Sequence, residues 1–245
     1  MQFDMSHVSW QEFPLFRDIP EEAVRTFFSV GFNFRYDIQS PIVCNGDQGD
    51  TFFLLLNGLA KLVLMNQEQE VVGVTLFRSG DFFGEMSILG PESSRSGNVV
   101  AISHVNVLAV QKKEFLKMLG HWPMLAMNLA REMGQRLRDM NERVTTEQLS
   151  DNRHKVAHTL LMLMRKGKVF NETGPVLMPP LSLPEWAFFC YTSQQAFMES
   201  MEQLKQAGAV EWQSQRIVIR NVDVLKEAAQ AHQTRLEFSR KLRVV

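Results

Sequence analysis

The sequence predicts an α+β fold in which a domain of antiparallel strands is followed by one long helix and a C-terminal unit of short helices and a hairpin. Short apolar runs separated by turn residues fill the stretch from about 32 to 110. A seven-residue apolar repeat then crosses 121–150, and two short helical patterns with a hairpin pattern follow. The chain has 245 residues, more than a typical domain of roughly 100–200, so we expect two domains.

Composition and apolar run lengths narrow the class of protein. Hydrophobic residues make up 45% of the chain and charged residues 22%, which is typical of a globular protein with a core. No apolar run approaches the ~20 residues that span a bilayer, and no basic stretch precedes an apolar run at the start. We therefore expect a cytoplasmic protein with no membrane partner. Cys44, in an apolar strand, is expected to be a buried thiol, and Cys190 to belong to the core.

The first half of the chain is predicted to form an antiparallel sandwich or barrel. Apolar runs such as 52–56, 60–65 and 71–77 are each followed by turn residues, mostly Gly, Asn or Asp. Short strands at regular spacing with such turns are typical of antiparallel sheets. Residues 1–120 are assigned to this domain.

A heptad repeat predicts a long helix over 121–150. The spacing is 4, 3, 4, 3 and 4 between Ala126, Ala130, Met133, Leu137, Met140 and Val144. So narrow a stripe favours a helix that pairs with a second copy of itself, because a 3.5-residue repeat is characteristic of coiled coils. The alternative is an ordinary amphipathic surface helix. The sequence thus favours a homodimer.

The last third, 151–245, reads as a helix followed by two short helices and a hairpin. Ser150, Asp151 and Asn152 are good N-cap residues and open a helix that ends near Lys166. Two short helices, 183–190 and 194–207, precede a hairpin at 210–220. The predicted capping pairs are Ser182 with Glu185 and Thr192 with Gln195, and Gly208 is the predicted stop. This order is that of a winged helix-turn-helix.

One motif goes beyond pattern. Residues 80–89 read GDFFGEMSIL, and residues 95–101 read RSGNVVA. This pair of segments resembles the phosphate-binding cassette of cyclic-nucleotide-binding domains. The order of sheet domain, long helix and winged helix-turn-helix resembles the bacterial cyclic-AMP receptor protein and fumarate–nitrate regulator superfamily. The resemblance implies that 1–120 form a cyclic-nucleotide-binding β-roll, 121–150 a dimerisation helix, and 151–245 a DNA-binding-like domain with a tail.

A cyclic phosphodiester needs a cation and hydrogen-bond donors, and its ribose hydroxyl needs an acceptor. Arg95 can pair with the phosphate, and Ser96 can donate to it. Glu85 can accept from the ribose 2′-hydroxyl. The remaining cassette positions predicted to bind the ligand are Gly84, Met86 and Ser87. The alternative is a Glu–Arg pair that only braces the sheet.

The base end of the nucleotide falls on the long helix. In the receptor family a Thr-Ser pair on the dimer helix contacts adenine, and Met140 and Asn141 stand at the matching positions. Met140 also belongs to the heptad repeat, so packing is its simpler role. Asn141 carries an amide that could read a purine edge. The expected effector is cyclic AMP, with cyclic GMP as the alternative.

The resemblance implies a transcription regulator that binds DNA through the second helix of its helix-turn-helix, with a protein partner such as RNA polymerase. The family pattern there is Arg-Glu-x-x-x-Arg, whereas this chain has Gln194, Gln195 and Glu199. Tyr191 stands where the family prefers Gly. The predicted DNA contacts are Ser193, Gln194, Gln195, Glu199, Arg216 and Arg220.

Charge and the missing arginines leave two functions open. Residues 1–120 carry 9 basic and 14 acidic residues, whereas 151–245 carry 13 basic and 9 acidic, four of the basic ones in 235–243. A basic C-terminal part favours a polyanion partner. The rival function is a cyclic-nucleotide sensor whose C-terminal domain binds a protein. We expect no enzyme, because no catalytic constellation stands out, and no metal site, because His154 and His158 lack a third ligand.

Overall fold

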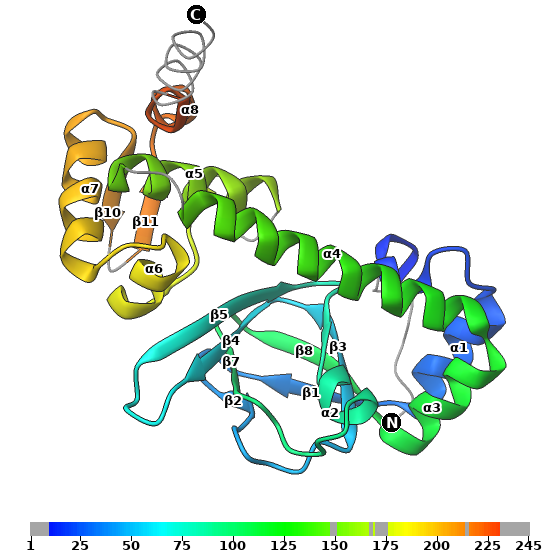
Figure 1. The fold of residues 1–245 in the computed structure, drawn as a ribbon. Coiled ribbons are helices and arrows are strands. Elements are labelled where there is room, and N and C mark those ends of the chain that lie inside the picture. Colours follow the sequence, from blue (N-terminus) through cyan, green and yellow to red (C-terminus); the bar gives the residue numbers. More distant parts are fainter. Residues whose placement is uncertain (1–9, 148–150, 167–168, 170–175, 214–215, 231–245) are drawn as a thin grey trace, which may run out of the picture. The chain divides into compact units, whose positions relative to one another are not determined.

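The computed structural model describes residues 10–147, 151–166, 169, 176–213 and 216–230 (Figure 1). The chain divides into two compact units, Met1–Asp139 and Met140–Val245, and each is described by itself. Both strands and helices are present, so the predicted α+β class is confirmed. In the part of the chain that is described, no helix is both long enough and apolar enough to cross a bilayer.

The first unit contains two antiparallel four-stranded sheets, with strand orders β1-β8-β3-β6 and β2-β7-β4-β5. The strands are β1 (Phe32–Tyr36), β2 (Pro41–Val43), β3 (Thr51–Asn57), β4 (Leu59–Met65), β5 (Val71–Arg78), β6 (Phe82–Phe83), β7 (Asn98–Ala101) and β8 (Val105–Gln111). Strand β3 explains the apolar run at 52–56, because alternate residues of a strand face opposite sides. Phe52 and Leu54 enter one core, and Phe53 and Leu55 enter the other.

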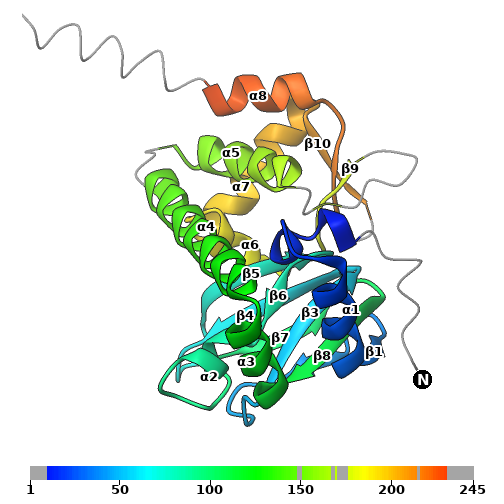
Figure 2. The same cartoon turned by 90° about the vertical axis from the view of Figure 1, so that its right-hand side faces the viewer.

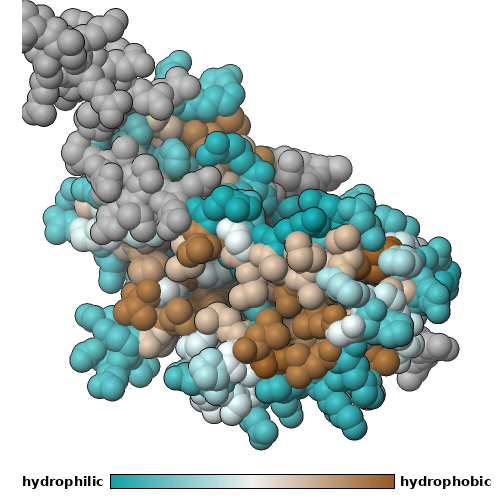
Figure 3. All heavy atoms as spheres, turned by 45° about the vertical axis from the view of Figure 1, so that its right-hand side comes forward, coloured by the Kyte–Doolittle hydropathy of each residue, from teal (hydrophilic) through white to brown (hydrophobic). Residues whose placement is uncertain are grey.

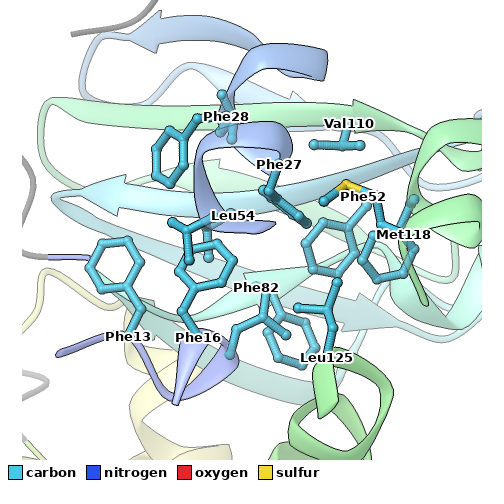
Figure 4. Packing of buried hydrophobic residues seen from close by; sticks show 14 of the residues in the cluster. Phe13, Phe16, Phe27, Phe28, Phe52, Leu54, Phe82, Val110, Met118 and Leu125 are labelled. Atoms are coloured by element: carbon cyan, nitrogen blue, oxygen red, sulfur yellow. The ribbon is translucent and has the colours of Figure 1, made fainter. Parts of the chain in front are cut away.

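The larger core lies between one sheet and the helices α1 (Glu21–Val30) and α3 (Lys112–His121), which lie side by side at one end of the strands (Figures 1 and 2). It is rich in aromatic rings (Figure 4). The rings of Phe52 and Phe115 stack with centroids 4.0 Å apart, and Phe27 meets both edge-on. Edge-on and stacked pairs stabilise a core by about 0.5–1.5 kcal/mol each beyond the area they bury.

The predicted long helix is α4 (Pro123–Glu147), and the segment before it forms the separate helix α3. Leu125 and Leu129 are buried on one face of α4. Between them in sequence, the buried Asn128 amide donates to the carbonyl oxygens of Leu15, at 3.1 Å, and Arg17, at 2.6 Å. These contacts fasten the start of α4 to the β-roll. Residues 148–150 lie outside the described residues.

The second unit has the order expected of a winged helix-turn-helix. Its elements are α5 (Asn152–Arg165), β9 (Val176–Leu177), α6 (Leu183–Phe189), α7 (Gln194–Gln206), β10 (Val210–Gln213), β11 (Arg216–Ile219) and α8 (Val222–Gln230). Helix α5 packs against α7 and α8, and the strands form a sheet of order β10-β11-β9. The rings of Trp186 and Phe197 stack at 5.9 Å between α6 and α7.

Most of the predicted helix ends are confirmed. The Asp151 side chain caps α5, the Ser182–Glu185 capping box is present, and Gly208 follows α7 with a φ of +75°. The Thr192–Gln195 capping box is wrong. Ser193 is the N-cap of α7, and the Thr192 hydroxyl donates instead to the Asn152 side chain at 2.9 Å.

The two thiols differ. Cys190 is buried, as predicted, and burial raises its pKa to about 12 although a hydrogen bond with Thr159 opposes the shift. The prediction for Cys44 is wrong, because this residue is exposed. It follows the last residue of β2 and begins a turn, in which its backbone N–H donates to the Asp47 carboxylate at 3.1 Å.

Candidate functional site

The cassette turns sharply at Gly84, between β6 and the short helix α2 (Glu85–Leu89). Gly84 has a φ of +87°, a left-handed conformation that favours glycine. A Cβ at this position would come within 2.6 Å of Arg95 Nη1 and 2.8 Å of the Thr51 carbonyl oxygen. The sequence therefore needs glycine here both for its backbone angle and for the close approach of Arg95.

Arg95 is the buried cation of the cassette, with 6% of its surface exposed. Its guanidinium donates to the carbonyl oxygens of Gly84, at 3.0 Å, and Thr51, at 2.6 Å, and lies 5.5 Å from the centre of the Phe53 ring. Burial lowers the pKa of Arg95, and the carboxylates of Asp50, Asp47 and Glu85 oppose this effect.

The partners of Arg95 make this position suited to an anion. Its two hydrogen bonds within the described chain go to neutral carbonyl oxygens rather than to a carboxylate. A buried charge without a directly bonded counter-charge is costly, and an anion that reaches it recovers part of that cost. A guanidinium also offers five donors in a planar fork, so donors remain for a phosphate.

Glu85 is buried and paired with a residue that sequence reasoning missed. Its Oε1 accepts from Arg136 Nη1 at 3.0 Å. Arg136 also donates to the Phe82 carbonyl oxygen and lies 4.3 Å from the centre of the Phe82 ring. Arg136 comes from α4 and lies four residues before Met140, on the same helical face. That spacing was the signal that could have found it.

The other cassette residues have different environments. The Ser87 hydroxyl is buried and donates to the Ser94 carbonyl oxygen at 3.0 Å, which braces the loop before Arg95. Ser96 and Met86 are exposed, as is Met140 on α4. Residue 141 is described by its backbone alone, so the predicted contact of Asn141 with the base stays a prediction. The structure thus brings Gly84, Glu85 and Arg95 together and adds Arg136 to them.

The second unit presents α7 on its surface. Ser193 caps this helix by accepting from the Ala196 N–H at 3.1 Å, and Gln194, Gln195 and Glu199 are exposed. The Gln195 amide donates to the Glu199 carboxylate at 2.9 Å. No cation accompanies these residues in the first two turns of α7.

The turn before α7 holds Tyr191, which stands where the receptor family prefers glycine, in a left-handed conformation. Tyr191 has a φ of +51°, a conformation that costs a non-glycine residue about 1–2 kcal/mol. Its contacts include a hydrogen bond from the Lys155 ammonium to the Tyr191 carbonyl oxygen at 3.1 Å and one from the Tyr191 N–H to the Phe188 carbonyl oxygen at 3.1 Å, and its ring lies 6.3 Å from that of Phe188.

The two predicted DNA contacts in the hairpin have different environments. Arg216 is half-buried at the start of β11. Arg220 is exposed and forms a surface ion pair with Glu211 at 2.6 Å. The tail residues 231–245 lie outside the described residues. Within the described ranges, no group of three or more His, Cys, Asp or Glu side chains is placed to hold a metal ion.

The sequence and the fold of this chain are both similar to those of known proteins. Residues 34–121 match the family model of the cyclic nucleotide-binding domain. The cyclic AMP receptor protein of Thermus thermophilus is 28% identical over 216 residues, covering 88% of this chain and 96% of the relative. The c-di-GMP responsive regulator CLP of Xanthomonas campestris has a TM-score of 0.68 at 15% identity, covering 82% of this chain and 100% of that one. FixK2 of Bradyrhizobium japonicum has a TM-score of 0.65 at 19% identity, covering 81% and 97%.

The last two structures, at such low identity, speak for the fold alone. Fold and cassette together define a cyclic-nucleotide-binding β-roll in one chain with a winged helix-turn-helix. Residues 34–121 thus match a cyclic nucleotide-binding domain, and over most of its length the chain is similar to a cyclic AMP receptor protein.

Proposed function

We propose that this protein is a dimeric transcription regulator whose DNA binding responds to a cyclic nucleotide, with cyclic AMP as the first candidate and cyclic GMP as the second. The observation that carries the proposal is the buried Arg95 guanidinium, which approaches Gly84 and is bonded to backbone carbonyl oxygens. A sensor of a cyclic phosphodiester needs such a cation. The protein would act in the cytoplasm, where it would bind its DNA target.

The phosphate and the ribose each have a partner in the cassette. The phosphate would pair with Arg95 and accept from the Ser96 hydroxyl. The ribose 2′-hydroxyl would donate to Glu85, whose carboxylate already holds Arg136. Because Arg136 belongs to α4, a ligand that bonds to Glu85 changes the balance of contacts between the cassette and the long helix. That shared carboxylate is a physical route by which the ligand can act on α4.

The exposed face of α4 supports a dimer. Met133 is 38% exposed, Leu137 60% and Met140 61%, and all three belong to the heptad repeat. A neighbouring face of α4, with Leu125 and Leu129, packs in the larger core of the first unit. Figure 3 shows, for one face of the molecule, hydrophobic residues that gather at the surface between hydrophilic ones. A second copy of α4 in a parallel pair would cover the heptad residues.

Binding of a random-sequence duplex pool, measured by fluorescence anisotropy with and without cyclic AMP, tests the proposal. We expect cyclic AMP to tighten binding by the wild type and to have no effect on Arg95→Ala. An equal response of the two proteins to the nucleotide would contradict the proposal. The interaction-module alternative is not favoured, because the curated relatives of this chain include cAMP-activated global transcriptional regulators.

A further inference from the structure

We infer that Glu199 of α7 is a specificity-determining residue that selects cytosine in the DNA half-site. An arginine at this position would select guanine, so the glutamate selects the opposite orientation of the G·C pair. The inference rests on the proposed DNA-binding function and deepens it. It concerns the one helix of the winged helix-turn-helix in which this chain departs most from its family.

Packing decides which residues of α7 can face DNA. Phe197, Met201 and Leu204 are buried in the second unit. The exposed residues of the first two turns are Gln194, Gln195, Met198 and Glu199. This surface carries one negative charge and no positive one, since Lys205, in the last turn, is the single cation in the sequence of α7. The face that could enter a major groove therefore reads bases with groups other than guanidinium or ammonium.

An internal hydrogen bond holds the one side chain of this face that can only accept hydrogen bonds. Gln195 Nε2 donates to Glu199 Oε1 at 2.9 Å, so one of the amide N–H groups is used within the helix. The same bond restricts the rotamers of the Glu199 side chain. Both side chains are exposed: the Glu199 carboxylate only accepts hydrogen bonds, whereas Gln195 keeps one N–H and its carbonyl oxygen, and Gln194 keeps its whole amide.

The major groove offers few donors to the Glu199 carboxylate. Guanine presents two acceptors, N7 and O6, and thymine presents O4, so a carboxylate is repelled by both bases. Adenine presents the N6 amino group beside the N7 acceptor, whereas cytosine presents its N4 amino group with no acceptor next to it. A carboxylate therefore fits cytosine best, and its charge strengthens the bond.

Glu202 supplies a matched control on the same helix. It is exposed, carries the same charge and lies three residues after Glu199. Its carboxylate is held by Lys205 at 3.5 Å and by the Gln206 amide at 3.4 Å. Replacing either glutamate by glutamine removes one negative charge from α7 near the DNA backbone. Only the change at Glu199 removes the proposed cytosine acceptor.

The test is a selection from a random duplex pool, with the full chain and saturating cyclic AMP, for the wild type, Glu199→Gln and Glu202→Gln. The wild type is expected to enrich cytosine at one position in each half-site. Changing that C·G pair to T·A should weaken its binding about tenfold in anisotropy titrations. Glu199→Gln should reduce that ratio below about threefold, while Glu202→Gln should keep it. Both variants should gain similar affinity for unselected DNA.

Each contrary result has a distinct meaning. A cytosine preference that Glu199→Gln retains, or a wild-type motif without cytosine, overturns this inference and leaves the proposed function standing. Equal weakening of all duplexes by Glu199→Gln also overturns it, because Glu199 would then orient the helix without reading a base. If the nucleotide-loaded wild type binds no duplex, the proposed function and this inference both fail.

Discussion

Replacing Gly84 by alanine perturbs the cassette where its backbone comes closest to Arg95. A Cβ here would stand 2.6 Å from Arg95 Nη1 and 2.8 Å from the Thr51 carbonyl oxygen, well inside the 3.4 Å at which ordinary contact begins. Thr51 is held in β3, so the guanidinium is the group that must move. The move breaks its bonds to both carbonyl oxygens and takes the cation away from the phosphate position.

Two costs can be separated for this variant. The left-handed backbone alone costs an alanine about 1–2 kcal/mol of folding free energy. The displaced guanidinium forfeits a charged hydrogen bond to the phosphate, about 1.5–3 kcal/mol, and so at least tenfold in nucleotide affinity. Gly46→Ala is the matched control, because its φ of +84° gives the same strain and its Cβ would meet nothing within 4 Å.

Urea unfolding and calorimetric titration with cyclic AMP measure the two costs. Both variants should lose similar stability, and only Gly84→Ala should lose nucleotide affinity. Equal nucleotide affinities for Gly84→Ala and the wild type would refute the argument that the Arg95 guanidinium must lie beside the Gly84 and Thr51 carbonyl oxygens to bind the nucleotide. Equal losses in the two variants would show that backbone strain alone, and no displacement of Arg95, weakens binding.

Three further predictions concern the long helix and the thiols. Leu137→Glu places two like charges in the exposed apolar seam and should raise the dimer dissociation constant at least about 100-fold in sedimentation; a wild type that is monomeric at micromolar concentration would refute the dimer. Arg136→Met leaves the buried Glu85 carboxylate unpaired and should cost about 1–3 kcal/mol in urea unfolding, most of which the added Glu85→Gln change should restore. At pH 8 a thiol reagent should modify Cys44 in the native protein and Cys190 only after unfolding, because a thiol whose pKa is raised to about 12 stays protonated below that pH; two fast native thiols would contradict this.

The strands, the long helix and the helix-turn-helix could be predicted because each has a periodic or turn-bounded pattern. The short helices α1 and α8 were not predicted. Helix α8 begins where the Asn221 side chain accepts from the backbone N–H groups of Asp223 and Val224, and among residues 222–229 it buries only Leu225 and Ala228. So short a stripe, at the start of a charged segment, gives too weak a period to separate from a loop.

In the candidate site, some residues could be predicted from the sequence and Arg136 could not. The cassette residues Gly84, Glu85 and Arg95 could be named from the motif, because a glycine turn and a fixed spacing are local properties of the chain. Arg136 could not be named that way, since its contact with Glu85 joins residues 51 positions apart. The prediction that Cys44 is buried was wrong for a related reason. An apolar neighbour on one side predicts burial, but the turn that begins at this residue carries it to the surface.

The pairing of Glu85 with Arg136 also explains how one chain can combine tight anchoring of α4 with sensitivity to a ligand. Asn128 and the buried leucines hold the beginning of α4 through neutral contacts that a nucleotide does not touch. Arg136, further along the helix, is held by a carboxylate that the ligand would share and by the rings of Phe82 and Phe77. A ligand that draws on this carboxylate therefore acts on the part of α4 that carries Leu137, the most exposed heptad residue of the first unit. Sensing and dimer packing then depend on adjacent residues of one helix, so changes at Arg136 should alter both.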